Sequence, residues 1–245
     1  MPTRRSFLTA TGAGAVAAAA AMSGTAALAE PSPPGTAPAR GGRTLLTPDQ
    51  ALALLKQGNR NFLTDSPVRA AVGRQRRLEI AQSQAPFAAY VTCSDSRVSP
   101  ELLFGRGLGE LFIIRNAGNT VDTVALGSIE YAVAELGVPL VVVMGHERCG
   151  AVAAAASVVR TNATFPGAIG RMVEPIIPAV LEAQRQPGDL VENAIRENVR
   201  RVVRQLRTGT DPLLLDPQRT GRLKVVGAYY DLDTGSVDFF DEPRA

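Results

Sequence analysis

The sequence carries almost no net charge. Its formal charge is +3, and two of the basic residues, Arg4 and Arg5, lie in a first segment that contains no acidic residue. From Glu30 onward the net charge is therefore +1. A protein whose main partner is nucleic acid needs a clear excess of positive charge to pair with phosphates. The charge balance argues against nucleic acid as a partner.

The sequence also lacks a strongly apolar run of the roughly 20 residues that a membrane-spanning helix needs. Its first apolar run is rich in Ala and Gly, follows the two arginines of TRRSFL (residues 3–8) and ends near ALA (27–29), which is typical of a cleavage site. This pattern predicts a signal peptide over residues 1–29 that uses the twin-arginine route, with an ordinary secretory signal as the alternative. We expect an exported protein, periplasmic or extracellular, without a stable membrane anchor.

The Pro- and Gly-rich residues 30–43 predict a flexible linker, and a folded domain is expected over residues 44–245. In that domain, short apolar runs typical of buried strands alternate with segments of helical periodicity. Strands are expected at residues 87–93, 110–116, 139–145, 224–231 and 236–241. Helices are expected at residues 46–63, 74–82, 123–137, 150–159, 168–185 and 190–206. The pattern predicts an α/β fold with a mostly parallel central sheet, flanking helices and an antiparallel C-terminal edge strand.

Histidine and cysteine are scarce, with one histidine and two cysteines in 245 residues. All three lie in two short segments, TCSDSRVSP (92–100) and GHERCGA (145–151), and each segment begins at the end of a predicted strand. In open parallel sheets the ligand site lies beyond the carboxyl ends of the strands. Two thiolates and one imidazole suit Zn²⁺ in a tetrahedral site. The sequence therefore predicts Cys93, His146 and Cys149 as zinc ligands.

Two charged residues accompany the first cysteine. In an extended segment Asp95 points the same way as Cys93, and Arg97 can hold its carboxylate in a two-pronged salt bridge. Two arrangements are open: Asp95 is the fourth zinc ligand, or it accepts a hydrogen bond from a water molecule in that position. The alternatives to a metal site are a disulfide between Cys93 and Cys149 and a plain surface ion pair between Asp95 and Arg97.

The two segments together resemble the motifs of the β-class carbonic anhydrases. CSDSRV (93–98) is similar to their Cys-x-Asp-x-Arg motif, and HERCG (146–150) is similar to their His-x-x-Cys motif. GELFIIRNAGN (109–119) and GSIEYAV (127–133) fit the family pattern in order and spacing. The resemblance covers most of residues 46–240.

This resemblance implies an enzyme that reversibly hydrates CO₂ to bicarbonate and a proton. It implies one zinc ion per subunit, held by Cys93, His146 and Cys149, with Asp95 and Arg97 as the catalytic pair. It also implies a homodimer or a higher even oligomer, with active sites at the interface and N-terminal helices that form an arm around the partner subunit.

Four further residues match family positions that bind substrate. Gln84 corresponds to a glutamine that hydrogen-bonds bicarbonate, Phe112 and Tyr131 correspond to aromatic residues that line the pocket, and the backbone N–H of Gly150 can meet the substrate. Three residues beside the zinc ligands depart from the family pattern: Glu147, Arg148 and Ala151. With no tryptophan in the chain, we do not expect the inhibitory bicarbonate pocket of some bacterial members.

Two other functions are compatible with these residues. Close relatives hydrolyse carbon disulfide or carbonyl sulfide with the same ligands, and the sequence does not separate those substrates from CO₂. A non-catalytic zinc-binding or redox module is the other alternative, although such a module needs neither Asp95 nor Arg97.

Overall fold

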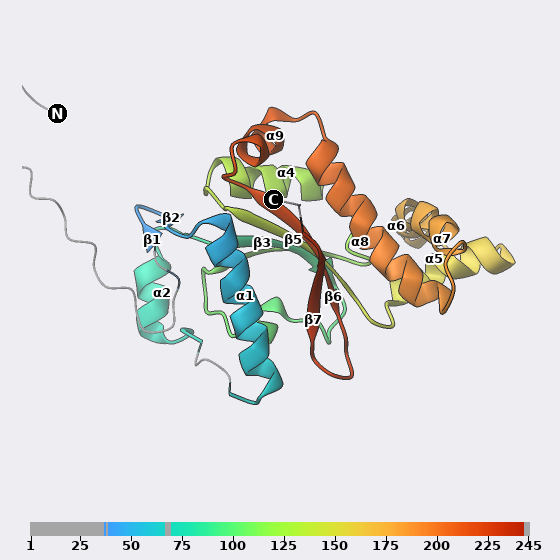
Figure 1. Cartoon of the computed structure of the whole chain (residues 1–245), viewed down its shortest axis with the longest axis horizontal. Helices are drawn as coiled ribbons and strands as arrows, with labels where there is room; N and C mark the ends of the chain where they lie inside the picture. Colours follow the sequence, from blue (N-terminus) through green and yellow to red (C-terminus); the bar gives the residue numbers. More distant parts are fainter. Residues whose placement is uncertain (1–36, 38, 67–69, 243–245) are drawn as a thin grey trace, which may run out of the picture. The chain divides into compact units, whose positions relative to one another are not determined.

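A computed structural model of the chain describes residues 37, 39–66 and 70–242. The predicted signal peptide and most of the predicted linker lie outside the described residues. Five strands form one sheet in the order β4-β3-β5-β6-β7, in which only β7 is antiparallel to its neighbour (Figure 1). Their bounds are β3 Ala88–Cys93, β4 Leu111–Asn116, β5 Leu140–His146, β6 Lys224–Tyr230 and β7 Val237–Asp241. The predicted fold class and the antiparallel edge strand are confirmed.

Helices cover both faces of this sheet. One face packs against α1 (Pro48–Leu63) and α3 (Pro100–Leu103), with Tyr90 and Phe104 at the centre of the contact. The other face packs against α4 (Thr123–Ala134), α8 (Leu190–Thr208) and α9 (Pro212–Arg219). Every residue of β3 and β5 is buried, which explains why these strands are continuous apolar runs in the sequence.

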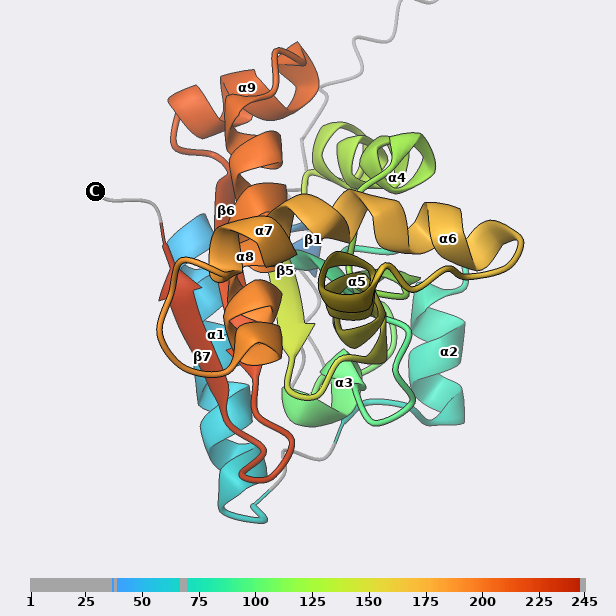
Figure 2. The same ribbon diagram turned by 90° about the vertical axis from the view of Figure 1, so that its right-hand side faces the viewer.

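A third cluster of apolar residues lies at the carboxyl ends of β3 and β5. It contains α5 (Gly150–Thr161) and α7 (Ile177–Ala183), which lie side by side in Figure 2. The single helix predicted over 168–185 is wrong: the segment divides into α6 (Ala168–Val173), a 3₁₀ turn (Glu174–Ile176) and α7. Pro175 and Pro178 lack the backbone N–H that a continuous helix requires.

The N-terminal part of the described chain is more ordered than the sequence indicated. β1 (Ala39–Arg40) and β2 (Arg43–Thr44) form a hairpin that lies, except for Thr44, in the segment predicted as linker, because Gly41 and Gly42 adopt positive φ and close a two-residue turn. Helix α1 begins with the expected Thr47 cap and packs on its own sheet. Helix α2 (Arg74–Ile80) buries none of its residues. Within the described residues, no helix is long and apolar enough to span a membrane.

The order of the strands determines where a ligand site can form. From β3 the chain goes to β4 on one side of that strand and then returns to β5 on its other side. The connections after β3 and β5 therefore leave in opposite directions and open a crevice beyond the two strand ends. Cys93 is the last residue of β3, and His146 is the last residue of β5.

Candidate metal centre

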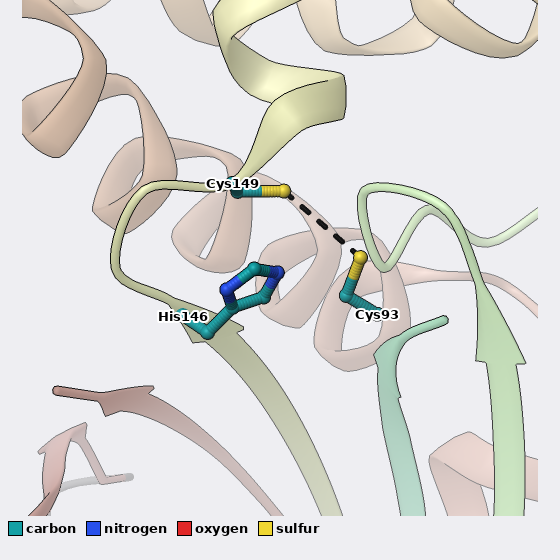
Figure 3. A group of neighbouring side chains, drawn as sticks. All are labelled: Cys93, His146 and Cys149. Atoms are coloured by element: carbon teal, nitrogen blue, oxygen red, sulfur yellow. Dashed lines mark hydrogen bonds between the residues drawn. The ribbon is translucent and has the colours of Figure 1, made fainter. Parts of the chain in front are cut away.

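The three predicted zinc ligands meet in this crevice. Their ligand atoms all lie within 4.8 Å of one another, and the three side chains are buried (Figure 3). The sulfur atoms of Cys93 and Cys149 are 4.0 Å apart and both cysteines are free, so the alternative disulfide is not formed. Two thiolates on one tetrahedral zinc ion are about 3.8 Å apart, whereas the sulfurs of a disulfide are about 2.05 Å apart. The spacing fits a shared metal ion.

The imidazole of His146 is oriented to bind a metal. Its Nδ1 lies 2.9 Å from the backbone carbonyl of Glu147, which accepts a hydrogen bond, so Nδ1 carries the proton. The lone pair is then on Nε2, which is buried and has no hydrogen-bond partner among the described residues. A buried nitrogen without a partner is costly, and a metal ion at this position would satisfy it.

The two thiols differ in acidity. A hydrogen bond from the Cys149 thiol lowers the pKa of Cys93 to about 4, while the same interaction and burial raise the pKa of Cys149. The pair therefore holds one negative charge, and metal binding has to displace the second proton. Cys149 is the N-cap of α5, where the helix dipole favours that second thiolate.

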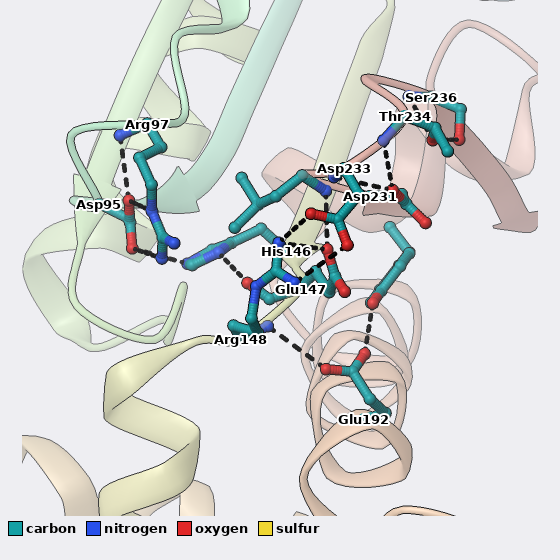
Figure 4. A network of polar contacts seen from close by, with 12 residues as sticks. Asp95, Arg97, His146, Glu147, Arg148, Glu192, Asp231, Asp233, Thr234 and Ser236 are labelled. Carbon is teal, nitrogen blue, oxygen red and sulfur yellow. Dashed lines mark hydrogen bonds and ion pairs between the residues drawn. The ribbon is translucent and has the colours of Figure 1, made fainter.

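Asp95 and Arg97 form a specific pair beside the ligands (Figure 4). The Arg97 guanidinium donates to both carboxylate oxygens, with Nε 2.9 Å from Oδ1 and Nη2 2.8 Å from Oδ2, and its backbone N–H also donates to Oδ1. These hydrogen bonds hold the pKa of Asp95 below its usual range. Oδ2 of Asp95 is 3.8 Å from Nε2 of His146. The carboxylate is thus ionised, oriented by Arg97 and directed at the ligand group.

Two residues that sequence reasoning missed hold the Cys93 segment in place. Nε of Arg115 donates to the carbonyl of Cys93 at 3.0 Å, and its Nη2 donates to the carbonyl of Asp95 at 2.7 Å. The backbone N–H of Gly118 donates to the Cys93 sulfur at 3.3 Å. Gly118 has φ +82°, and an added Cβ would lie 2.5 Å from Cδ1 of Ile176, so only glycine fits. The signal that could have found Arg115 is a charged residue directly after four apolar residues of the same strand.

We expect that Arg115→Lys releases zinc about tenfold faster and lowers CO₂ hydration to a similar degree, because a single ammonium cannot bridge both carbonyls in the same geometry. Zinc transfer to a chromophoric chelator measures the release rate. Wild-type zinc release in the folded variant would contradict a role for Arg115 in holding the ligand segment.

Comparison with known proteins agrees with this geometry. Residues 88–237 match the family model described as carbonic anhydrase. The chain is 37% identical over 191 residues to a carbonic anhydrase of Mycolicibacterium smegmatis, covering 78% of this chain and 92% of that protein. It is 38% identical over 189 residues to carbonic anhydrase 2 of Mycobacterium tuberculosis, covering 77% of this chain and 90% of that protein. The chain belongs to the carbonic anhydrase family.

Solved structures indicate the β class of that family. A structure from a study of two tetrameric β-carbonic anhydrases of Sordaria macrospora matches with a TM-score of 0.61 and 26% identity, covering 69% of this chain and 87% of that chain. A Coccomyxa β-carbonic anhydrase in complex with acetazolamide matches with a TM-score of 0.58 and 28% identity, covering 66% of this chain and 75% of that chain.

In this carbonic anhydrase, the predicted substrate-binding residues do not all lie at the metal centre of their own chain. Gly150 lies at the metal centre, because it follows Cys149 at the start of α5, and it is exposed. Gln84 is exposed and lies four residues before β3, at the opposite end of that strand from Cys93. Phe112 is paired with Ala89, about 13 Å along the strand from Cys93, and its ring packs 6.2 Å from that of Tyr131.

Proposed function

We propose that this protein is a zinc carbonic anhydrase that reversibly hydrates CO₂ to bicarbonate and a proton. The observation that carries the proposal is the buried Cys93–His146–Cys149 group with an ionised Asp95 directed at it. The donor set fits Zn²⁺, with room for one further ligand beside the three side chains. When bound, zinc supplies the Lewis acidity that makes water a nucleophile near neutral pH.

Asp95 has the central role among the residues of the chain itself. Its carboxylate accepts a hydrogen bond from the attacking water and orients that water's lone pair toward carbon. Arg97 keeps Asp95 charged and, by donating to both carboxylate oxygens, prevents the carboxylate from binding the metal. The N–H of Gly150, at the exposed start of α5, donates to an oxygen of bicarbonate. Because His146 is the only histidine, the product proton leaves through water, buffer or another side chain and not through a histidine relay.

The position of the aromatic pair supports an even-numbered oligomer. Phe112 and Tyr131 cannot line the crevice of their own chain, and 49% of Tyr131 is exposed. We place these two residues and Gln84 against the metal centre of a second subunit, where the rings form an apolar wall for CO₂. Sedimentation of the active enzyme as a monomer would contradict this arrangement.

Export remains a proposal that rests on Arg4, Arg5 and the small residues before Glu30. Cell fractionation tests it: the protein is expected outside the cytoplasm, and replacing both arginines with lysine should retain it inside. Cytoplasmic retention of the unaltered chain would overturn the proposal.

Stopped-flow CO₂ hydration by the zinc-loaded protein tests the function. We expect activity already at neutral pH, because both oxygens of Asp95 are bound by Arg97 and not free to bind the metal. Activity only at alkaline pH would show that Asp95 closes the site. Absence of activity at every pH, with zinc bound, would rule out CO₂ hydration and direct attention to the sulfur substrates.

A further inference from the structure

Two residues, Glu147 and Arg148, connect two of the three zinc ligands. The loop that they form sets the position of Cys149 relative to His146. Arg148 has φ +52°, a conformation that residues other than glycine rarely adopt. Such a loop keeps its shape only when the surrounding structure holds it there.

The first set of contacts holds the loop to the turn between β6 and β7. The Glu147 backbone N–H donates to the Tyr230 carbonyl at 2.9 Å, and its carboxylate accepts the Leu232 N–H at 3.1 Å. The Arg148 guanidinium donates to both carboxylate oxygens of Asp233, at 2.6 and 3.0 Å (Figure 4).

A second contact holds the loop from the side of α8. Oε1 of Glu192 accepts the backbone N–H of Arg148 at 3.3 Å, and Oε2 accepts the hydroxyl of Tyr229. Glu192 lies in the first turn of α8, and Tyr229 is a nearly buried residue of β6. One carboxylate therefore links the loop, a helix and a strand.

The turn that carries Asp233 is itself ordered. Oδ1 of Asp231 accepts the backbone N–H groups of Asp233 at 3.0 Å and Thr234 at 2.8 Å. The hydroxyls of Thr234 and Ser236 are 2.8 Å apart and share a hydrogen bond. Asp233 is thus presented to Arg148 from a fixed position and can restrain it.

We propose that Glu192 and Asp233 are positioning residues that, through Arg148, hold the His146–Cys149 loop in the conformation that chelates zinc. Neither carboxylate is a predicted zinc ligand, and each acts by restraining the loop between two ligands. The inference rests on the zinc site proposed above and adds the groups that determine how tightly that site retains its metal.

The test compares zinc release from the full chain with release from Glu192→Gln and Asp233→Asn. Glu192→Gln leaves one acceptor oxygen where the carboxylate uses two. Asp233→Asn removes one of the two carboxylates that form ion pairs with Arg148 and leaves the 3.1 Å pair with Glu147. Each variant is expected to transfer zinc to a chromophoric chelator about tenfold faster than the wild type. The ligand-field absorption of the Co²⁺-loaded variants is expected to shift, because those bands report the arrangement of the ligands and not global stability.

Asp238→Asn is the matched control. It removes the 3.0 Å ion pair between Asp238, on β7 of the same hairpin, and Arg196 of α8. In the part of the chain that the structure describes, neither residue has a hydrogen bond to Glu147 or Arg148, and the substitution leaves Arg196 in place over the ring of Tyr229. Its zinc release and Co²⁺ spectrum should equal those of the wild type.

Wild-type release rates and spectra in both test variants would overturn the positioning role. Equal acceleration in Asp238→Asn would also overturn it, because the effect would then be a general loosening of the hairpin. A wild-type chain that takes up no zinc would instead overturn the proposed function, and the role of this network with it.

Discussion

Cys149→Ala is expected to abolish stoichiometric zinc binding and to lower kcat/KM for CO₂ hydration by at least about 10³-fold. The variant removes one of two thiolates from a group of three ligands whose atoms lie within 4.8 Å of one another. The Lewis acidity of a catalytic metal is worth several kcal/mol of the barrier, and each 1.36 kcal/mol is a factor of ten in rate. Metal analysis after dialysis and stopped-flow assay measure the two effects.

The fold of this variant has to be checked separately, because Cys149 is also buried. Alanine leaves only a small cavity and the first turn of α5 keeps its backbone. We therefore expect the circular dichroism spectrum of Cys149→Ala to match that of the metal-free wild type. Ala151→Ser serves as a control. Ala151 follows Gly150 in the first turn of α5, two residues after the ligand Cys149, and the variant should keep full zinc content. A zinc-free Cys149→Ala variant with wild-type activity would show that the reaction does not use this site.

Asp95→Asn is expected to lower kcat by about 10²- to 10⁴-fold while zinc content stays unchanged. The amide is neutral and has a single acceptor oxygen, so it cannot accept the three hydrogen bonds from Arg97 and a fourth from the attacking water. Ser96→Ala, an exposed position between the two partners, is the control and should retain wild-type kcat. Asp95→Asn with more than a tenth of wild-type kcat would exclude Asp95 as the group that orients water.

A double variant separates the role of Arg97 from that of Asp95. Arg97→Ala alone removes the two guanidinium hydrogen bonds and frees the Asp95 carboxylate to move toward the ligand atoms, so activity should fall strongly. If Arg97 acts only through Asp95, its removal from the Asp95→Asn background should change kcat little. If the loss of kcat in the double variant equals the product of the fold-losses in the two single variants, Arg97 has an independent role, such as direct binding of bicarbonate.

Much of the fold follows from local sequence patterns. The buried runs that became β3 and β5 needed no tertiary information, and Thr47 followed by Pro48 marked the start of α1 correctly. The predictions failed where a local signal was ambiguous. α9 carries Pro217 inside its last turn and was missed, and α4 ends at Ala134, three residues before the end of the helix predicted over 123–137.

The sequence by itself determined the chemistry of the candidate centre. One histidine and two cysteines, all at or shortly after the ends of predicted buried strands, could meet only if those strands were neighbours. The zinc ligands were predicted on that basis, and the catalytic role of the Asp95–Arg97 pair was implied by the family resemblance. The type of ligand residue and the position of a strand end are properties of short segments, so the sequence alone is enough to predict them.

Only the tertiary structure decided what holds these residues. Arg115 reaches back from β4 to the carbonyls of Cys93 and Asp95, and Glu192 and Asp233 reach the ligand loop from positions 44 and 85 residues away in the sequence. The structure also separated Phe112 and Tyr131 from the metal centre of their own chain. Contacts of this kind depend on strand order and register, which are fixed by the packing of the whole sheet and are not encoded in any one segment.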